Sequence, residues 1–497
     1  MSEANRILDR RRAGVLLHLT SLPGPRHEGG LGPSAYRFVD TALAMGLSVW
    51  QTLPIHPTHG DGSPYQCLSA HAGHPELIDL GALAARGWLT EADLAVSAED
   101  PQQSRRTLLQ RAFDSFSAQG GLAQPDFCDF RAAKADWLED FALYMALRAH
   151  HQGAPWQSWP EGLRDRHPET LQAVARDLSQ FVALEVFVQF VFFQQWRALR
   201  TYANARGLLL FGDVPIFVAG DSADVWADPE SFDLQAHGEP RVVAGVPPDY
   251  FSATGQRWGN PHYRWDRMEA DDFRWWRARF RTQFELFDWV RIDHFRGLEA
   301  YWEIPAEEET ALGGRWVKAP GQALLEALFR ESPTGRLPLV AENLGIITQE
   351  VEALREAFQI PGMLILQFAF EGGPDNPYLP VHHPENSVVY TGTHDNDTTL
   401  SWFEGLPESL RAHVYEVLGH PDLPMPDALL KAALASRARL AMIPMQDLLG
   451  LGRGFRMNTP GTTEGNWSWR LQPGQLGEAR MGVVADWVRA SERWPSP

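Results

Sequence analysis

Short apolar segments alternate with helical segments along most of the 497-residue sequence, and this alternation limits the possible folds more than any other feature. The apolar segments have the length and residue types of β-strands, and most of the intervening segments repeat apolar residues at helical spacing. Strands that alternate with helices form parallel sheets with both faces buried. Eight such units predict an α/β fold, a (β/α)8 TIM barrel forming a single elaborated domain over residues 1–497. The predicted strands are GVLLHLTS, LSVWQTLPI, LLLFGDVPIFV, FDWVRIDH, EAYWEIPA, LPLVAENLG, GMLILQFAF and NSVVYTGTHDND.

Two stretches are too long to be simple barrel connections. Residues 56–206 separate the second and third predicted strands and contain helical patterns such as KADWLEDFALYMALRAHH. Because a structureless loop of this length is not credible in a compact domain, we predict a mainly helical insertion there. Residues 233–265 precede the strand that ends at Asp293 and are rich in glycine, proline and aromatic residues. We predict that this second insertion is a mobile lid over the strand ends.

Ionisable residues close four of the predicted strands. They are Asp213, Arg291 with Asp293, Glu342, and His394 with Asp395. The active site of a (β/α)8 barrel lies at the carboxyl ends of its strands. A single acidic residue at such an end could instead cap the following helix. Four strand ends of this kind in one barrel favour an active site.

The segment VRIDHFRGL places a cation two residues before a carboxylate. Side chains alternate along a strand, so we predict that one face carries Phe287, Trp289, Arg291 and Asp293 and the other carries Val290 and Ile292. The pair could be a structural ion pair, but burying one costs several kcal/mol without good partners, so it is weak evidence for stability alone. As part of an active site, the cation would favour the ionised form of Asp293.

Three carboxylates at one mouth suit chemistry at an acetal carbon. Such chemistry needs one carboxylate to attack or stabilise an oxocarbenium-like centre and one carboxylic acid to protonate the leaving oxygen. Asp293, beside its cation, fits the nucleophile, and Glu342, which follows an apolar strand, fits the acid. His394 and Asp395 would bind sugar hydroxyls and stabilise positive charge near the ring.

The composition indicates which kinds of partner and which cellular compartment to expect. With 63 acidic and 44 basic residues, the formal net charge is -19, and this field would repel nucleic acid and anionic membranes. The two cysteines, Cys67 and Cys128, offer no disulfide framework and suit a reducing compartment. The opening MSEANRILDRRR lacks the apolar core of a signal peptide. The apolar stretch Phe181–Phe193 is too short and too polar to span a bilayer. We therefore expect a cytoplasmic protein that acts on a neutral substrate.

Motifs along nearly the whole chain carry a family resemblance. They are SPYQ, FGDVPIFV, DSADVW, GVPPDYFS, TGQRWGNP, VRIDHFRGL, VAENLG, TGTHDNDT and MNTPGTTEGNWSWR. On these motifs the sequence resembles the 4-α-glucanotransferases of the amylomaltase (disproportionating enzyme) type, glycoside hydrolase family 77 of the α-amylase clan. The Arg-x-Asp-His, Glu and His-Asp elements belong to the whole clan, whereas GVPPDYFS and TGQRWGNP are more specific to the glucanotransferases.

The resemblance implies a role for each matching residue. Asp293 would be the nucleophile, Glu342 the general acid/base and Asp395 the stabiliser of the transition state. The residues around the reacting glucose would be Asp213, Arg291, His394 and the stacking partner Tyr65, with Trp258 in the lid on the acceptor side. The implied substrates are α-1,4-glucans and maltooligosaccharides, as donor and acceptor, with glucose as a further acceptor. The implied reaction moves a glucanyl unit to a 4-hydroxyl group and needs no cofactor and no metal.

Three positions depart from the family pattern. The family usually has Phe at the position of His71, Asn at the position of His74 and Glu at the position of Ala253. None of them is a carboxylate of the predicted site. A retaining α-1,4-glucan hydrolase is the nearest alternative function, because the same carboxylates would serve it. The aromatic lid favours transfer, since an oriented acceptor can outcompete water that the lid excludes.

More distant alternatives have weaker support. A non-catalytic glucan-binding barrel should have lost a catalytic carboxylate, and all three are present. A metal-dependent barrel hydrolase would need paired histidines at the first strand end, where only His18 occurs. We interpret the pairs His71/His74 and His382/His383 as solvated or locally hydrogen-bonded. The sequence contains no Gly-x-x-x-x-Gly-Lys phosphate loop.

Overall fold

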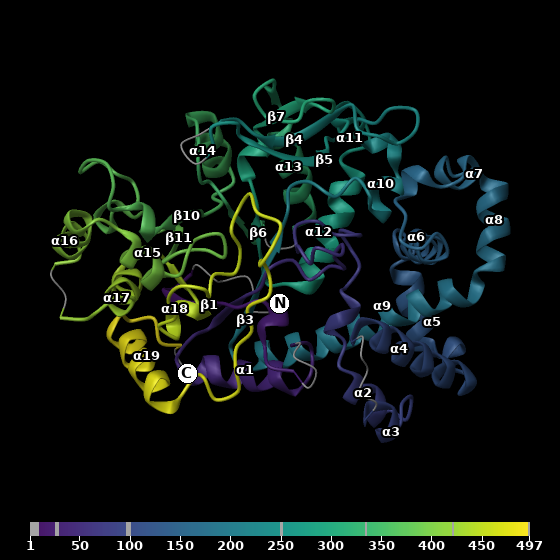
Figure 1. Ribbon diagram of the computed structural model, residues 1–497, viewed down its shortest axis with the longest axis horizontal. Helices are drawn as coiled ribbons and strands as arrows, with labels where there is room; N and C mark the ends of the chain where they lie inside the picture. The colour runs from purple at the N-terminus through teal and green to yellow at the C-terminus, as the bar shows by residue number, and fades with distance from the viewer. Residues whose placement is uncertain are drawn as a thin grey trace.

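A closed barrel of eight parallel strands forms the centre of the computed structural model, which describes residues 9–24, 29–95, 101–248, 252–332, 335–419 and 422–495 (Figure 1). The order of strands around the barrel is β1-β12-β11-β10-β9-β6-β3-β2. The strands are β1 (Arg12–Leu16), β2 (Val49–Gln51), β3 (Leu209–Val214), β6 (Trp289–Ile292), β9 (Leu339–Ala341), β10 (Gly362–Ile365), β11 (Ser387–Tyr390) and β12 (Leu440–Pro444). This architecture confirms the predicted TIM barrel.

Helices connect most of the barrel strands and cover the outside of the barrel. They are α1 (Pro33–Ala44), α9 (Ser179–Ala205), α12 (Arg274–Leu286), α13 (Gly321–Glu331), α14 (Gln349–Ala357), α15 (Thr399–Gly405), α16 (Glu408–Val417) and α17 (Asp427–Ala435). After β12 the chain forms α18 (Met445–Leu448) and α19 (Glu478–Ala490). The stretch Phe181–Phe193 lies in α9, where Gln189 is fully buried and bonds the backbone of Gly73 in both directions.

Between β2 and β3 the chain forms a group of further helices before it reaches α9. They are α2 (Leu80–Ala85), α3 (Glu91–Ala95), α4 (Pro101–Ala118), α5 (Pro125–Ala133), α6 (Leu138–His150), α7 (Glu161–Arg164) and α8 (Pro168–Asp177). Figure 1 shows this blue group at the right of the barrel. Helix α9 packs against α4, α5 and α6 and also against β3, so it joins these helices to the barrel. Within the described residues, no single helix is long and apolar enough to cross a membrane; the pair of α8 and α9 meets that test only jointly, across an 82° bend.

A second sheet lies beside the barrel, at the top of Figure 1. Its strands are antiparallel and have the order β5-β4-β7-β8. They are β4 (Val242–Val246), β5 (Gln256–Pro261), β7 (Ala300–Pro305) and β8 (Arg315–Lys318), and the helices α10 (Ala223–Ala227) and α11 (Trp265–Ala270) lie on either side of the β4–β5 pair in the chain. Strands from before and after β6 therefore combine in one layer. Residues 249–251, within GVPPDYFS and the predicted lid, lie outside the described residues.

One predicted barrel strand was wrong. The segment EAYWEIPA forms β7 of the antiparallel sheet, and the eighth barrel strand is β12, LAMIP, which the sequence did not single out. The sequence pattern did not reveal β12 because this strand is short and contains Leu, Ala and Met, which also favour helices. It also follows soon after the Ala-rich helix α17. The number of barrel strands was right, but the membership was not.

The buried side chains of the barrel form two groups, one inside the barrel and one between the strands and the surrounding helices. The inner group includes Phe211 of β3, Trp289 of β6 and Val340 of β9, while Val290 and Ile292 of β6 belong to the outer group under the helices. The predicted alternation along β6 is therefore confirmed for these residues. It fails for Phe287, which precedes the strand and joins the outer group.

Candidate active site

A buried cation links β3 to β6 inside the mouth of the barrel. Asp213 and Arg291 are paired across the two strands. Nη1 of Arg291 donates to both carboxylate oxygens of Asp213, at 2.8 and 2.7 Å, and its Nη2 donates to Oδ1 of Asp293 at 2.7 Å. The side chains of Arg291 and Asp213 are 5% and 0% exposed, whereas that of Asp293 is 29% exposed. Asp293 is thus the carboxylate of this group that substrate can reach.

Glu342 lies at the end of the next strand around the barrel. It directly follows β9, and β9 pairs with β6 through Arg291 and Val340. The backbone N–H groups of His294 and Leu344 donate to its two carboxylate oxygens, at 2.7 and 2.9 Å. His294 has a left-handed backbone, with φ of 53°, which is uncommon for a residue other than glycine. This turn directs the His294 N–H toward Glu342 and thereby fixes the carboxyl group close to Asp293.

Burial and charge separate the acidities of the two carboxyl groups. Burial raises the pKa of Asp293 to about 6, although the Arg291 cation lowers it; the Asp213 and Asp395 carboxylates add to the rise. Burial also raises the pKa of Glu342 to about 7, with Arg291 and the two backbone donors opposing the rise and Asp293 adding to it. Arg291 acts on the pKa of Asp293 in the predicted direction, but burial outweighs it. Near neutral pH, Glu342 therefore retains a proton more readily than Asp293 does.

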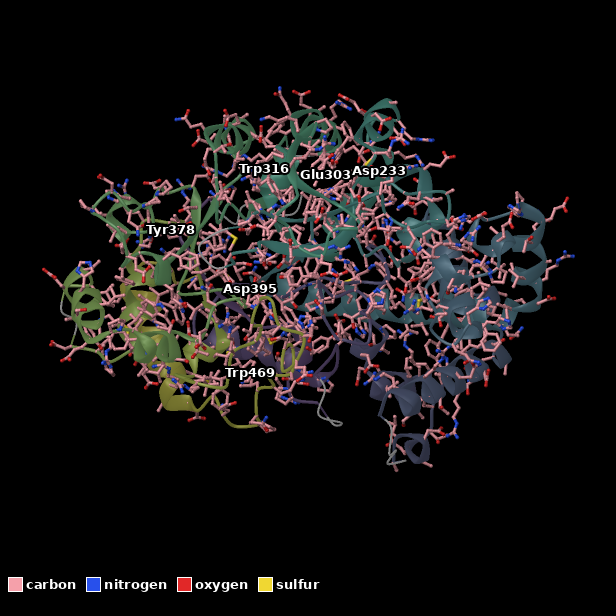
Figure 2. All side chains as sticks on the ribbon, turned by 45° about the horizontal axis from the view of Figure 1, so that its top comes forward. Asp233, Glu303, Trp316, Tyr378, Asp395 and Trp469 are labelled. Atoms are coloured by element: carbon pink, nitrogen blue, oxygen red, sulfur yellow. The ribbon has the colours of Figure 1, made fainter. Side chains whose placement is uncertain are left out.

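The loop after β11 brings a histidine and a third carboxylate to the same mouth. His394 is buried, and its Nε2 lies 3.3 Å from Oδ2 of Asp395, which is 42% exposed. The ring of Tyr65 stacks on that of His394 at 5.2 Å, and its hydroxyl donates to Oδ2 of Asp213 at 2.7 Å. Tyr65 therefore joins this loop to the Arg291 cluster. Asp395 lies near the middle of the molecule in Figure 2.

Trp258 reaches the site from the second sheet. It lies in β5, within the insertion of residues 233–265 that we predict to be a lid. Its half-buried indole packs edge to face on His294, with ring centroids 5.0 Å apart, and its Nε1 donates to Oε1 of Gln256 at 3.1 Å. Pairing between β4 and β5 therefore positions an aromatic ring next to the residue that follows Asp293.

All eight predicted site residues consequently meet at one end of the barrel. Asp213 is inside β3, Asp293 and Glu342 directly follow β6 and β9, and Asp395 lies five residues beyond the end of β11. The motif MNTPGTTEGNWSWR contributed to the family resemblance, but no role was predicted for any of its residues. Asn458 from this motif bonds Asp395, and the ring of Trp467 lies 5.9 Å from Tyr65 and 6.0 Å from His394. The motif itself was the only available signal for them.

The three departures from the family pattern lie outside this cluster. His71 is buried, with its ring stacked on Trp137 and its Nδ1 2.8 Å from Oγ1 of Thr282. The His74 ring accepts from the N–H of Glu76 and caps a short turn. Ala253 is exposed between β4 and β5. The interpretation of these histidines as solvated or locally hydrogen-bonded holds for His74, and for His382 and His383, whose rings contact the carbonyl oxygens of Pro374 and Tyr378. It is wrong for His71, which is buried and bonds a residue distant in the sequence.

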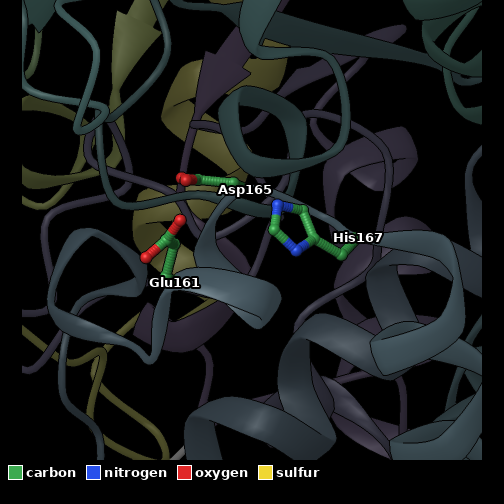
Figure 3. Close-up of side chains that lie close together, drawn as sticks. All are labelled: Glu161, Asp165 and His167. Carbon is green, nitrogen blue, oxygen red and sulfur yellow. The ribbon is translucent and has the colours of Figure 1, made fainter.

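One group of potential metal ligands occurs in the part of the chain that the structure describes. Glu161, Asp165 and His167 have ligand atoms within 4.8 Å of one another and are exposed (Figure 3). They lie at α7, in the helical group beside the barrel. Both carboxylate oxygens of Asp165 already accept hydrogen bonds from Arg164, at 2.7 and 2.9 Å. We assign no ligand to this group.

The barrel fold and the carboxyl groups at the mouth of the barrel together define the class of protein. A (β/α)8 barrel that gathers carboxyl groups of different acidity at its strand ends is equipped for acid–base chemistry. The chain belongs to the 4-alpha-glucanotransferase family, whose model matches residues 17–476. Its enzymatic activity is accordingly 4-α-glucanotransferase activity.

Individual relatives agree with this assignment over almost the full length. The chain is 47% identical to the 4-alpha-glucanotransferase of Thermus thermophilus, with 97% of this chain and 99% of the relative covered. It is 46% identical to that of Synechocystis sp., with 96% and 97% covered. Among solved structures, the amylomaltase from Streptococcus agalactiae in complex with acarbose superposes with a TM-score of 0.94 at 36% identity, covering 98% of this chain and 100% of that one.

Proposed function

We propose that this enzyme transfers α-1,4-glucan segments from a donor maltooligosaccharide or starch to the 4-hydroxyl group of an acceptor glucan or glucose, by a retaining double displacement. The observation that carries the proposal is the pair of carboxyl groups at the ends of neighbouring strands, Asp293 bonded to Arg291 and Glu342 with a pKa of about 7. The similar amylomaltase described in complex with acarbose supports a glucan substrate.

In the first step, a carboxylate oxygen of Asp293 attacks the anomeric carbon of the donor. The glycosidic bond breaks, and its electron pair goes to the leaving oxygen, which takes the proton of Glu342. The products are a glucosyl ester on Asp293 and a shortened glucan. Arg291 supports this step because its cation favours the ionised Asp293 over the protonated form.

In the second step, the acceptor 4-hydroxyl group attacks the same carbon and the ester bond to Asp293 breaks. The acceptor proton goes to Glu342, which is now a base, so both carboxyl groups return to their starting states. Two inversions retain the anomeric configuration. Asp395 with His394 would stabilise the positive charge on the ring, and Asp213, Arg291 and Tyr65 would hold its hydroxyl groups.

The proposed reaction requires no cofactor, and a cytoplasmic location remains a prediction. Incubation with purified maltotriose tests the function directly. Transfer yields a ladder of longer and shorter oligomers on chromatography, whereas hydrolysis yields only glucose and maltose. Asp293→Asn is the matched inactive control, because an amide cannot form the ester. A product pattern without oligomers longer than the donor would refute transfer and favour the hydrolase.

The covalent step has its own test. Glu342→Gln cannot protonate a poor leaving group, but a donor with an activated leaving group should still load Asp293. Because the second step also lacks its base, the ester should accumulate and appear by mass spectrometry as a sugar adduct on the peptide that contains Asp293. A reproducible adduct on another carboxylate, with Asp293 unmodified, would overturn the nucleophile assignment.

A further inference from the structure

The segment Arg456–Asn458, near the carboxyl end of the chain, lies against the loop that carries His394 and Asp395. The N–H of Asn458 donates to the carbonyl oxygen of His394 at 3.1 Å. The guanidinium of Arg456 donates to the carbonyl oxygens of Asp395 and of Asn458. Backbone contacts thus fasten two loops that are distant in sequence, and they place the side chain of Asn458 at the third carboxylate of the site.

Both oxygens of the Asp395 carboxylate have a partner in this arrangement. Nδ2 of Asn458 donates to Oδ1 at 2.6 Å, and Nε2 of His394 lies 3.3 Å from Oδ2. The carboxylate is 42% exposed, so packing alone does not fix its orientation. The Asn458 amide is the hydrogen-bond donor on one oxygen, and the His394 ring lies close to the other, so contacts on both oxygens restrict the plane of the group. Fixed dipoles of this kind stabilise developing charge best when they are preorganised.

We propose that Asn458 is a positioning residue, which holds the Asp395 carboxylate in the orientation required in the transition state. This inference rests on the proposed role of Asp395. Asn458 acts through Asp395 and leaves the carboxylate its full charge, because an amide is a neutral donor. A cation at this position would pair with the carboxylate and offset the negative charge that the reacting ring needs. An amide supplies orientation alone.

The alternative is that Asn458 only anchors its loop, and the loop contains a matched control for that possibility. Asn466 accepts from the N–H of Thr459 at 2.9 Å, and its Nδ2 donates to the carbonyl oxygen of Thr462 at 3.0 Å. These contacts are internal to the loop, and no hydrogen bond between Asn466 and Asp395 is described in the structure. Removing the Asn466 amide therefore loosens the loop without touching the carboxylate directly.

The first experiment compares Asn458→Ala with Asn466→Ala by maltotriose disproportionation and by melting temperature. We expect Asn458→Ala to lower kcat about 10-fold to 100-fold, the effect of one hydrogen bond to a charged group, while KM for the donor stays nearly unchanged. Asn466→Ala should keep the wild-type kcat, although its melting temperature falls at least as far. An unchanged kcat in Asn458→Ala would overturn the proposal, as would equal losses of kcat and stability in both variants.

The second experiment tests whether the effect passes through Asp395. Asn458→Ala is introduced into Asp395→Asn, and kcat is measured with a donor that has an activated leaving group. We expect no further loss, because residues that act as a unit give non-additive effects. The same fold-loss in both backgrounds would overturn the positioning role. A wild-type kcat in Asp395→Asn alone would instead refute the proposed function of Asp395, and the two failures are thereby distinguishable.

Discussion

In the proposed mechanism, Arg291 helps to determine which of the carboxyl groups of Asp293 and Glu342 keeps the proton, and replacing it with the neutral Gln tests this directly. The guanidinium is 5% exposed and bonds Asp213 and Asp293 at 2.7 to 2.8 Å. It opposes the rise in pKa that burial causes at both Asp293 and Glu342. It bonds directly only to Asp293 of these two, so Asp293 should respond more strongly to its removal.

The size of the effect follows from these contacts. An opposite charge at this range lowers a carboxyl pKa by about 1 to 3, so Arg291→Gln should move the pKa of Asp293 from about 6 to about 7 to 9. Removing the cation also raises the pKa of Glu342, but by less because Arg291 does not bond it directly, so the difference in pKa between the two carboxyl groups narrows or reverses. The nucleophile must be ionised to attack. The acid limb of kcat/KM should therefore move to higher pH, and activity at a fixed acidic pH should fall about tenfold each time the limb moves by about one pH unit.

The assay is kcat/KM between pH 4.5 and 9 with an activated glucosyl donor, alongside circular dichroism to confirm folding. Two variants supply controls of opposite sense. Arg291→Lys keeps the charge, so its acid limb should move less. Asp213→Asn removes a carboxylate that raises the pKa of Asp293, so the limb should move to lower pH. A folded Arg291→Gln protein whose acid limb coincides with that of the wild type would refute the reasoning.

Three further predictions concern partition and stability. Trp258→Ala should raise the fraction of donor cleavage that ends in hydrolysis and weaken acceptor binding about fivefold to tenfold, since a stacked ring contributes about 1 kcal/mol. An unchanged ratio of transfer to hydrolysis with a large fall in melting temperature would indicate a packing role. Glu342→Gln should melt about 1 to 3 °C higher than the wild type at pH 8 and show no gain at pH 4. The reason is that a carboxyl group whose pKa is raised by folding destabilises the fold only above its unfolded pKa, where it must ionise. When the pH is lowered from 7 to 5, the free energy of unfolding measured with a chemical denaturant should fall by about 2 kcal/mol less in His71→Phe than in the wild type. Burial lowers the pKa of His71 to about 3, so the wild-type fold is penalised once the unfolded chain takes up a proton below pH 6.5; equal losses would contradict this.

The local rules of strand and helix formation predicted most of the barrel strands and the residues that the structure brings together at the mouth of the barrel. The period of the apolar pattern predicted the alternating units, and the ionisable residues near the ends of the apolar segments predicted Asp213, within β3, and Asp293 and Glu342, directly after β6 and β9. The same rules could not predict which sheet a strand joins, because that depends on the strands with which it pairs. EAYWEIPA is a strand, but its hydrogen bonds go to β4 and β8 in the second sheet, and nothing in its eight residues specifies those partners.

What the sequence determined is therefore a set of elements and the kinds of side chain at their ends, because periodicity and residue type act over a few neighbouring positions. Only the tertiary structure decided how those side chains act on one another. The order of the pKa values of Asp293 and Glu342 depends on burial and on one cation between strands, neither of which is a local property. Asn458 reaches Asp395 across 63 residues of chain, because the loops that carry them meet at the same end of the barrel.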